Sequence, residues 1–306
     1  MYYPILRGKL NELLALRELA TLAHKKFIPV IEPVKKDIKA LIKTIQTLNS
    51  NAIEPYIIIN PTIGDFSDSK IALYEELRKF DCIGYQVLYS INESTEIYED
   101  FLDLGTFGLF IQKGIDQNIL DFSEKSNINF IQNDTNPNIK RRIKNRVSYE
   151  DFFKKQQRNA DYPKESPFSS LHSYYNDKPN PDHGFADYTI TGNDFSEGGG
   201  PAYVVTIHCS YIDNSRFDEL FIRHYSSEND GTPTNPGAKF KEALDLLIKD
   251  IQKKDIPFID TNALNEFTYL HTIEHFPGLG QVKKISIKHH IETVNHFLAA
   301  TVEANS

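Results

Sequence analysis

The sequence predicts an α/β fold of the (β/α)8 TIM-barrel type, irregular in its last strands and followed by a C-terminal helical extension. Short apolar runs alternate with segments of helical periodicity in the first half of the chain. Several of these runs are apolar throughout, which is typical of strands buried on both faces of a parallel sheet. The 306 residues are enough for one closed barrel, with an open doubly wound sheet as the alternative.

The first two βα units show the pattern most clearly. Residues 2–6 form a short extended start, and residues 9–24 repeat leucine and alanine at helical spacing. The run FIPVIEP, residues 27–33, is apolar and ends at a proline, which predicts a buried strand. Residues 37–49 place Ile38, Leu41 and Ile45 on one stripe and predict the next helix.

The same rhythm continues as far as Phe152. Further strands are predicted at residues 55–61, 82–90, 106–113, 128–134 and 146–152. The helices between them are predicted at residues 68–80, 94–104 and 116–125. Strands separated by helical segments imply right-handed βαβ crossovers in a parallel sheet.

The regular pattern ends after Phe152. Residues 154–185 are polar and rich in Pro and Asn, and we expect a long loop there. Three extended runs, at residues 186–192, 203–210 and 219–227, are expected to supply the last wall of the barrel. The part from 238 to 306 reads as mainly helical, beginning with an amphipathic helix at 238–253. The prediction is therefore a single barrel-like domain over residues 1–306.

Composition points to a cytoplasmic globular protein. The net charge of −8 favours solubility and disfavours long-range attraction to phosphate backbones. The N-terminal residues lack the pattern of a secretory signal, and no apolar run approaches the roughly 20 residues that span a bilayer. Cys82 and Cys209 lie in apolar runs, and we expect two buried, reduced thiols rather than a disulfide framework.

Polar residues follow the carboxyl ends of the predicted strands. In parallel α/β folds these ends converge on one rim, where sites are built, although any one residue there can simply cap a helix or form a turn. The residues are Glu32, Asn60, Ser90, Lys113, Asp134, Asp151, Asp187, His208 and His224. Glu32 stands out because it ends an apolar strand, and a buried carboxylate there needs a cationic or metal partner. The candidate cations are Lys35, Lys113 and Arg158.

The histidines suggest a second chemistry. His208 and His224 face each other if their strands form an antiparallel hairpin, and with Asp187 they would make a two-His, one-carboxylate metal set. The pattern is not specific, so we predict no metal site and name no cofactor. The glycine-dense SEGGGP, residues 196–201, does not lie between a strand and a helix, which predicts a turn rather than a phosphate-binding loop.

Basic residues concentrate at 140–146 (KRRIKNR) and continue at 154–158 (KKQQR). Such clusters are most often solvated surface, and a nucleic-acid contact is the functional alternative. Because the whole chain is acidic, this alternative is not favoured.

Several strings taken together resemble a bacterial and phage family called beta-protein-like. They are YYPILRGKLNELLALRELA, FIPVIEPVK, QRNADYP, FADYTITG, GGPAYVV and HFPGLGQVKKISIKHH, and they extend over nearly the whole chain. The resemblance implies a barrel-like fold, one long domain and a gene in phage-defence neighbourhoods, beside a nuclease-like companion. It implies no catalytic role. The polar residues within these strings are Arg7, Lys9, Glu32, Lys35, Arg158, Asp161, Asp187 and Tyr188.

We therefore expect a phage-defence component whose barrel binds a ligand or a partner protein. The expected binding residues are Arg7, Lys35, Asn60, Lys113, Asp134, Arg158, Tyr188 and His224. The first alternative is a metal- or acid/base-dependent hydrolase at the barrel mouth, with Glu32, Asp187 and His208 as catalytic residues. The second is a nucleic-acid binder that uses residues 140–158.

Overall fold

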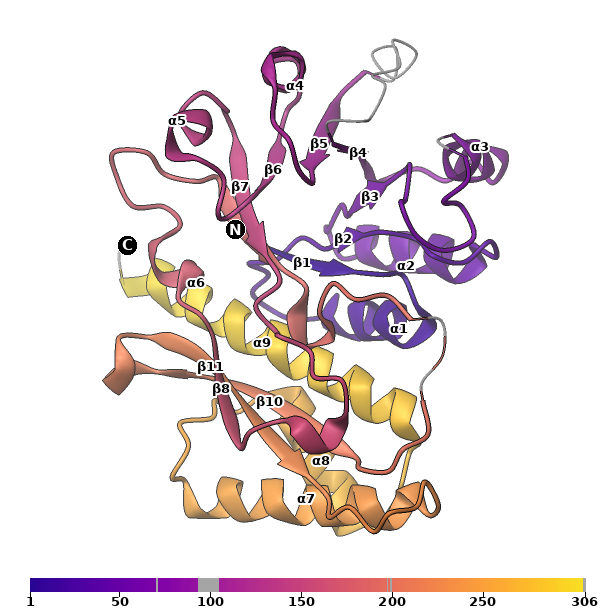
Figure 1. Cartoon of the computed structure of the whole chain (residues 1–306), viewed down its shortest axis with the longest axis vertical. Coiled ribbons are helices and arrows are strands. Elements are labelled where there is room, and N and C mark those ends of the chain that lie inside the picture. The colour runs from indigo at the N-terminus through magenta and orange to yellow at the C-terminus, as the bar shows by residue number, and fades with distance from the viewer. Residues whose placement is uncertain (70, 93–104, 197, 199, 305–306) are drawn as a thin grey trace. The chain divides into compact units, whose positions relative to one another are not determined.

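A closed barrel of eight parallel strands, in the order β1-β2-β3-β4-β5-β6-β7-β9, forms the first of two compact units (Figure 1). The computed structural model describes residues 1–69, 71–92, 105–196, 198 and 200–304. The barrel unit comprises Met1–Thr21, Phe27–Asp151 and Tyr174–Tyr188. The predicted TIM-barrel-like class is confirmed.

The strands and helices of the barrel unit follow the predicted order. The strands are β1 (Tyr2–Leu6), β2 (Val30–Ile31), β3 (Tyr56–Ile58), β4 (Gln86–Ile91), β5 (Phe107–Ile111), β6 (Asn129–Gln132), β7 (Arg146–Glu150) and β9 (Gly184–Asp187). The helices are α1 (Leu10–Leu19), α2 (Lys39–Asn49), α3 (Ala72–Lys79), α4 (Gln117–Ser123) and α5 (Pro137–Lys140). The helix predicted at residues 94–104 lies outside the described residues, apart from which each predicted βα unit through β7 is present.

Side chains alternate between the two faces of the barrel wall, as strand geometry requires. The inward positions form one buried cluster of Tyr3, Ile5, Val30, Ile58, Leu88, Phe110, Ile128, Phe130, Val147, Tyr149, Ala186 and Tyr188. Aromatic rings fill much of this interior, with Tyr3 edge-on to Phe130 at 5.2 Å and Phe110 stacked on Tyr149 at 4.5 Å between centroids. The barrel is thus a packed core rather than a pore.

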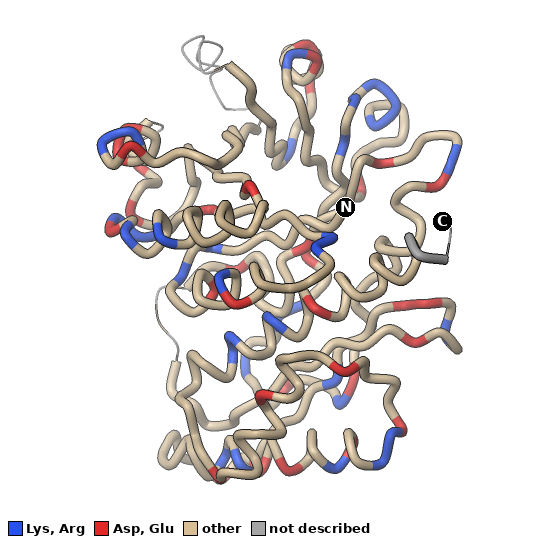
Figure 2. The backbone as a smooth tube through the Cα atoms, turned by 180° about the vertical axis from the view of Figure 1, so that it is seen from behind, with Lys and Arg blue, Asp and Glu red and all other residues tan. Residues whose placement is uncertain are grey.

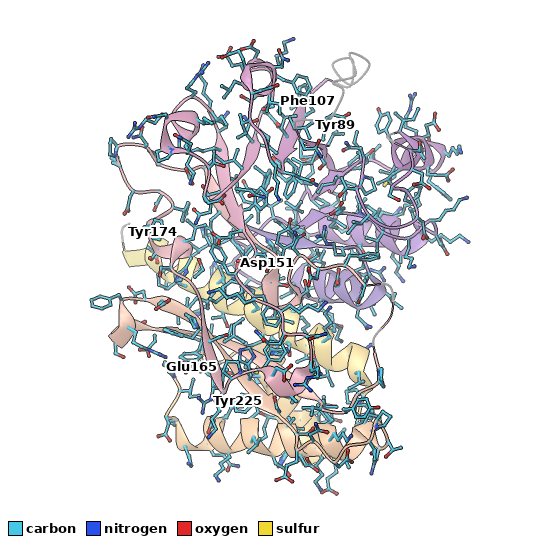
Figure 3. The ribbon with its side chains drawn as sticks, in the orientation of Figure 1. Tyr89, Phe107, Asp151, Glu165, Tyr174 and Tyr225 are labelled. Atoms are coloured by element: carbon cyan, nitrogen blue, oxygen red, sulfur yellow. The ribbon has the colours of Figure 1, made fainter. Side chains whose placement is uncertain are left out.

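Outward positions pack against helices. Tyr89 and Phe107 lie on the neighbouring strands β4 and β5 (Figure 3), in a buried cluster with Ile119 and Phe122 of α4. Phe107 stacks on Phe122 with ring centroids 5.2 Å apart. The helix starts where the Asp116 side chain accepts a hydrogen bond from the Ile119 backbone N–H at 2.8 Å.

The second unit contains a three-stranded antiparallel sheet in the order β10-β11-β8. It comprises Leu22–Lys26, Phe152–Ser173 and Thr189–Ser306. Its strands are β8 (Glu165–Ser169), β10 (Thr206–Asp213) and β11 (Glu219–Ser226). Its helices are α6 (Leu171–Tyr174, whose last residue belongs to the barrel unit), α7 (Pro236–Lys253), α8 (Asn262–Thr272) and α9 (Leu279–Ala304).

The prediction that residues 203–210 and 219–227 belong to the barrel wall is therefore wrong. β10 and β11 form the predicted hairpin, with His208 opposite His224, but they belong to the separate sheet and not to the barrel wall. The reason is closure: β9 pairs with both β7 and β1, so the barrel has no edge left for another strand. The predicted loop at 154–185 also contains β8 and α6. The chain divides into two compact units, and the single domain over residues 1–306 stays a prediction.

Helices cover one face of this sheet. Val205, Ile207 and Cys209 pack with Phe240, Leu244 and Leu247 of α7, Phe267 of α8 and Ile285 of α9 in one buried cluster. Burial raises the pKa of the Cys209 thiol, which keeps it protonated at neutral pH. Cys82 is also a free thiol, but it is only partly buried, contrary to the prediction.

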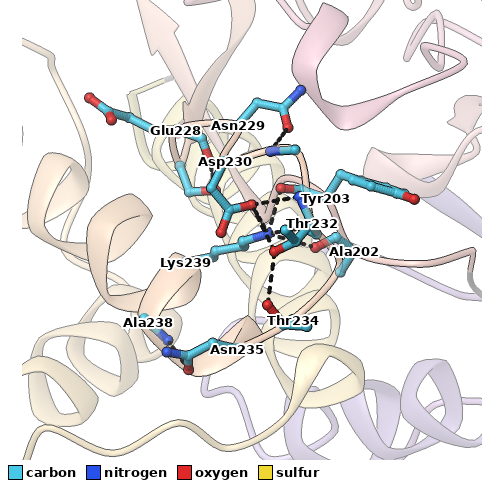
Figure 4. Close-up of polar contacts among 12 residues, drawn as sticks. Ala202, Tyr203, Glu228, Asn229, Asp230, Thr232, Thr234, Asn235, Ala238 and Lys239 are labelled. Carbon is cyan, nitrogen blue, oxygen red and sulfur yellow. Dashed lines mark hydrogen bonds and ion pairs between the residues drawn. The ribbon is translucent and has the colours of Figure 1, made fainter.

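Hydrogen bonds from the Lys239 side chain connect two loops to the start of α7 (Figure 4). Its side chain is buried, yet its Nζ donates to the carbonyl oxygens of Tyr203, at 2.9 Å, and Thr232, and forms an ion pair with Asp230 at 2.8 Å. Asn235 caps the helix by accepting from the Ala238 N–H. A buried ammonium is stable here because carbonyl oxygens and a carboxylate replace its water.

Charges of both signs are interspersed along both units, as the colouring of Figure 2 shows. Within the described part of the chain, no helix is long and apolar enough to cross a membrane.

Candidate functional site

The carboxyl end of the barrel carries a ring of inward polar side chains. Each of these residues is the next inward-pointing position after the apolar inward residues of its strand. Because side chains alternate between the two faces of a strand, all of them point into the barrel at its carboxyl end. They are Arg7, Glu32, Asn60, Ser90, Gln112, Gln132 and Asp151. Figure 3 labels Asp151, which comes directly after β7 and its final residue Glu150.

Glu32 is the centre of this ring. Arg7 Nη1 donates to Glu32 Oε2, and the two side chains are only 9% and 4% exposed. Glu32 Oε1 accepts from the backbone N–H of Thr62 at 2.9 Å and from its hydroxyl at 3.2 Å. Both carboxylate oxygens are thus held by groups from neighbouring strand ends, which fixes the carboxylate plane.

Arg7 is positioned from three sides. Its backbone N–H donates to Glu12 Oε2 at 2.7 Å, at the start of α1. Its guanidinium lies 5.0 Å from the centroid of the Tyr188 ring, a cation–π contact. Burial raises the pKa of the Tyr188 hydroxyl, with Arg7 opposing the shift and Glu32 and Asp151 adding to it. Tyr188 is therefore a neutral hydroxyl at physiological pH.

Hydrogen bonds extend the ring across β3, β4 and β5. The Asn60 amide donates to the Ser90 carbonyl and accepts from the Ser90 N–H, each at 2.8 Å. Gln112 Nε2 donates to Ser90 Oγ at 3.0 Å and to Thr62 Oγ1 at 3.4 Å. Because Thr62 also bonds Glu32, one network runs from Arg7 to Asn60. We call Arg7, Glu32, Asn60, Thr62, Ser90 and Gln112 the rim network.

The structure brings only part of the predicted set to this rim. Arg7, Glu32, Asn60 and Tyr188 lie together, whereas Lys35, Lys113 and Asp134 are exposed. Arg158 belongs to the second unit, where it forms an exposed ion pair with Asp161 at 2.7 Å. The cation paired with Glu32 is Arg7, so the prediction of Lys35, Lys113 or Arg158 as its partner is wrong. Sequence reasoning missed Thr62 and Gln112.

Asp187 lies on the opposite face of the wall from Glu32. It alternates with the inward residues Ala186 and Tyr188, so its side chain points outward. Its Oδ1 accepts from the Tyr2 hydroxyl at 2.8 Å, and Tyr2 stacks on Phe185 with centroids 5.2 Å apart. Burial, with the Asp187 charge, raises the pKa of Tyr2. Asp187 therefore contributes to the outer packing of β1 and β9.

The residues of the proposed catalytic set come from both compact units. Glu32 is inside the barrel, Asp187 is on its outer face, and His208 belongs to the second unit. Asp187 belongs to the barrel unit, and the two histidines predicted to join it at a metal site belong to the second unit. Among the described residues, no group of three or more His, Cys, Asp and Glu side chains is arranged to hold a metal ion.

A second polar cluster lies on the antiparallel sheet. His208 and His224 contact each other through their Nδ1 atoms at 2.8 Å, and Ser166 Oγ lies 2.8 Å from His224 Nε2. The Tyr162 ring stacks on His224 with centroids 4.8 Å apart. Burial lowers the pKa of His208 well below its usual value and that of His224 to about 4. Ser166 was missed because its strand was read as loop.

Two residues of the basic segment 140–146 are held by internal contacts, whereas Arg141, Arg142 and Lys144 are exposed. Lys140 Nζ donates to the Asn133 carbonyl at 2.6 Å, and Arg146 forms an ion pair with Asp182 in which both side chains are 11% exposed. The segment includes α5 and appears as blue tube in Figure 2. These contacts support a structural role for Lys140 and Arg146.

Comparison of the chain with protein-family models, with curated proteins and with solved structures gives no match. The candidate sites therefore depend on their own geometry.

Proposed function

We propose that the chain is a cytoplasmic phage-defence component whose barrel binds a small polar ligand at the rim network. The observation that carries the binding role is the continuous hydrogen-bonded chain from Arg7 to Asn60, which spans the ends of β1 to β5. Ligand sites in barrels are built at this end, from a few fixed polar groups over an apolar floor. The floor here is the aromatic interior.

The composition of the network favours a neutral ligand rich in hydroxyl or amide groups. The one full positive charge, on Arg7, is already balanced by Glu32. A charged ligand would lose its hydration without gaining a free counter-charge, which is costly at a partly desolvated site. Amide and hydroxyl groups of Asn60, Thr62, Ser90 and Gln112 instead offer donors and acceptors to neutral polar groups.

Binding is favoured over hydrolysis at this rim. Acid–base catalysis needs a carboxyl group that can exchange a proton with the substrate. Both oxygens of Glu32 instead accept hydrogen bonds from Arg7 and Thr62, and Asp187 faces the other side of the wall. The geometry thus supports Glu32 as a group that fixes Arg7 and Thr62.

The binding role is tested by identifying small molecules that co-purify with the chain. Heat release followed by mass spectrometry should detect a ligand in the unaltered protein that is lost from Gln112→Ala. The matched control is Gln117→Ala, because Gln117 lies on α4 and is exposed. Equal ligand content in both variants, or no ligand in any preparation and no binding in a metabolite screen, would contradict the proposal.

The defence role is a separate inference that depends on the family resemblance. A plaque assay tests it: cells that carry the gene should resist phage, cells with the gene deleted should not, and Gln112→Ala should behave like the deletion. Protection by the Gln117→Ala gene provides the control. Affinity purification from infected cells tests for the proposed nuclease-like companion, which is expected to co-purify with the full chain.

A further inference from the structure

Ser166, His224 and His208 form a linear hydrogen-bonded series on three strands of one sheet. Ser166 lies on β8, His224 on β11 and His208 on β10. The Ser166 Oγ to His224 Nε2 distance is 2.8 Å, and the distance between the Nδ1 atoms of His224 and His208 is also 2.8 Å. A hydroxyl, an imidazole and a third group that orients the imidazole are the parts of an activated serine nucleophile.

Proton positions in this series can be deduced from the atoms involved. When Ser166 donates to Nε2 of a neutral His224, the proton of His224 must sit on Nδ1. That N–H then donates to Nδ1 of His208, whose own proton lies on Nε2. His208 thus holds His224 in the tautomer whose Nε2 can accept the serine proton.

Burial keeps both imidazoles uncharged at neutral pH. The pKa of His224 is lowered to about 4, mainly by burial and further by Arg223, with Glu165 opposing. The pKa of His208 is lowered mainly by burial, then by His224 and Lys283. Both imidazoles are thus in the unprotonated form that can accept a proton, and a pKa of about 4 makes His224 a weak base, so the geometry of the series carries the assignment.

Aromatic rings hold the pair in place. Tyr162 stacks on His224 with an interplanar angle of 22°. Phe153 lies edge-on to His208, with centroids 5.1 Å apart. These contacts restrict both rings and place apolar side chains around the pair.

Partial exposure distinguishes the Ser166–His224 pair from two other hydroxyl–imidazole pairs in the same unit. Ser210 Oγ lies 2.7 Å from His290 Nδ1, and Thr261 Oγ1 lies 2.8 Å from His289 Nδ1, but these four residues are all buried. Ser166 and His208 are partly exposed, and β8 is an edge strand of its sheet. The Ser166–His224 pair is therefore only partly buried, whereas the other two pairs are enclosed in the core.

We propose that Ser166 is the nucleophile of an acyl-ester hydrolase site, with His224 as general base and His208 as the residue that positions it. Ser166 Oγ attacks the ester carbonyl carbon while its proton passes to His224 Nε2. The ester C–O bond then breaks, and the leaving alcohol takes that proton. Water attacks the acyl-serine with His224 again accepting its proton, which returns to Ser166 Oγ as the carboxylic acid leaves. None of these three residues belongs to the rim network of the barrel unit.

The test is covalent labelling of the intact chain by a small alkyl fluorophosphonate at neutral pH, mapped by peptide mass spectrometry. We expect an adduct on Ser166, with release of fluoride, and no adduct after Ser166→Ala. Ser169→Ala is the matched control, because Ser169 is on the same strand and its Oγ accepts from the Leu171 N–H. This variant should label at the unaltered rate.

Two histidine variants distinguish activation of Ser166 by the histidines from labelling of a serine that is merely accessible. His224→Gln should slow labelling of Ser166 at least tenfold, and so should His208→Phe, which keeps an aromatic ring beside Phe153 but removes the acceptor. Circular dichroism and urea denaturation confirm that each variant is folded. Folded protein without an adduct on Ser166, or labelling that is unchanged in His224→Gln, would overturn the proposal. Hydrolysis of p-nitrophenyl acetate should be lost in parallel with labelling.

Discussion

Arg7 and Glu32 form a buried ion pair that joins the carboxyl ends of β1 and β2 inside the barrel. Taking two charges out of water is costly, and the pair persists because Thr62 satisfies the remaining oxygen of Glu32. The Arg7 guanidinium gains a further contact with the face of the Tyr188 ring. The pair therefore holds the rim of the barrel in one arrangement.

Glu32→Gln should be strongly destabilising. The substitution leaves Arg7 buried beside a neutral amide, and removal of one partner of a buried pair costs about 3 kcal/mol or more in the free energy of unfolding. Urea denaturation monitored by circular dichroism measures this loss. The matched control is Glu76→Gln, because Glu76 pairs with Lys79 on α3, where the lysine side chain is 65% exposed. This control should change stability by less than about 0.5 kcal/mol, and an equal effect of the two substitutions would refute the assignment.

The barrel was predictable because its strands are short and apolar. The buried residues of its helices also recur on one face of each helix. In α2 that face carries Leu41, Thr44, Ile45 and Leu48, spaced as a helix requires. Which polar residue at the end of each strand points into the barrel was harder to predict. Lys113 and Asp134 are the last polar residues of the predicted strands 106–113 and 128–134. The structure places Gln112 and Gln132 inward, one and two residues earlier.

The second unit was harder to predict because its sheet is assembled from distant segments. β8 comes from a polar, Pro-rich stretch, and it pairs with β11 more than 50 residues later, as in the pair Arg223 and Glu165. Pro167 within the strand was a usable signal, because proline is tolerated on an edge strand. The opposition of His208 and His224 was predictable from the hairpin, but the third member, Ser166, was not.

Tyr2→Phe should destabilise the barrel without affecting its rim. The substitution removes the 2.8 Å hydrogen bond from Tyr2 to the buried Asp187, and a bond to a charged acceptor contributes about 2 kcal/mol. Because Asp187 faces outward, ligand binding at the rim network should be unchanged at a temperature where the variant is folded. Tyr56→Phe is the control, since the Tyr56 hydroxyl forms no hydrogen bond with the described residues and should cost less than about 0.5 kcal/mol. Reduced ligand affinity in folded Tyr2→Phe would place Asp187 in the binding site after all.

Lys239→Met should release the two loops at the start of α7. Nζ donates to Tyr203 and Thr232 carbonyls and pairs with Asp230, and the substitution leaves these partly buried oxygens without their donor. We expect a loss of about 3 kcal/mol in the free energy of unfolding. Hydrogen exchange should also increase at residues 202–205 and 230–235. Lys241→Met is the control, because Lys241 is 57% exposed in its pair with Glu274, and it should change neither quantity.

Acid should destabilise the second unit through its buried histidines. Burial lowers the pKa of His289 to about 3, with His290 also lowering it and the Ser210 carbonyl opposing. His289 is held neutral because Nδ1 accepts from Thr261 and Nε2 donates to Ser210 O, each at 2.8 Å. In the unfolded chain a histidine takes up its proton near pH 6.5. Unfolding therefore takes up protons between pH 6.5 and 3, and stability present above pH 6.5 is lost as the pH falls.

The expected slope is about 1.4 kcal/mol per pH unit for each such histidine, and His224 adds to it between pH 6.5 and its folded pKa of about 4. Urea denaturation at pH 7, 6 and 5 measures the slope. The imidazole resonances of His289 and His224 should not titrate in the folded protein between pH 7 and 5, whereas in the urea-unfolded protein they should titrate near pH 6.5. A folded-state midpoint near 6.5 for either residue would show that its imidazole is not held neutral, and for His224 it would also remove the support that neutrality gives to its role beside Ser166.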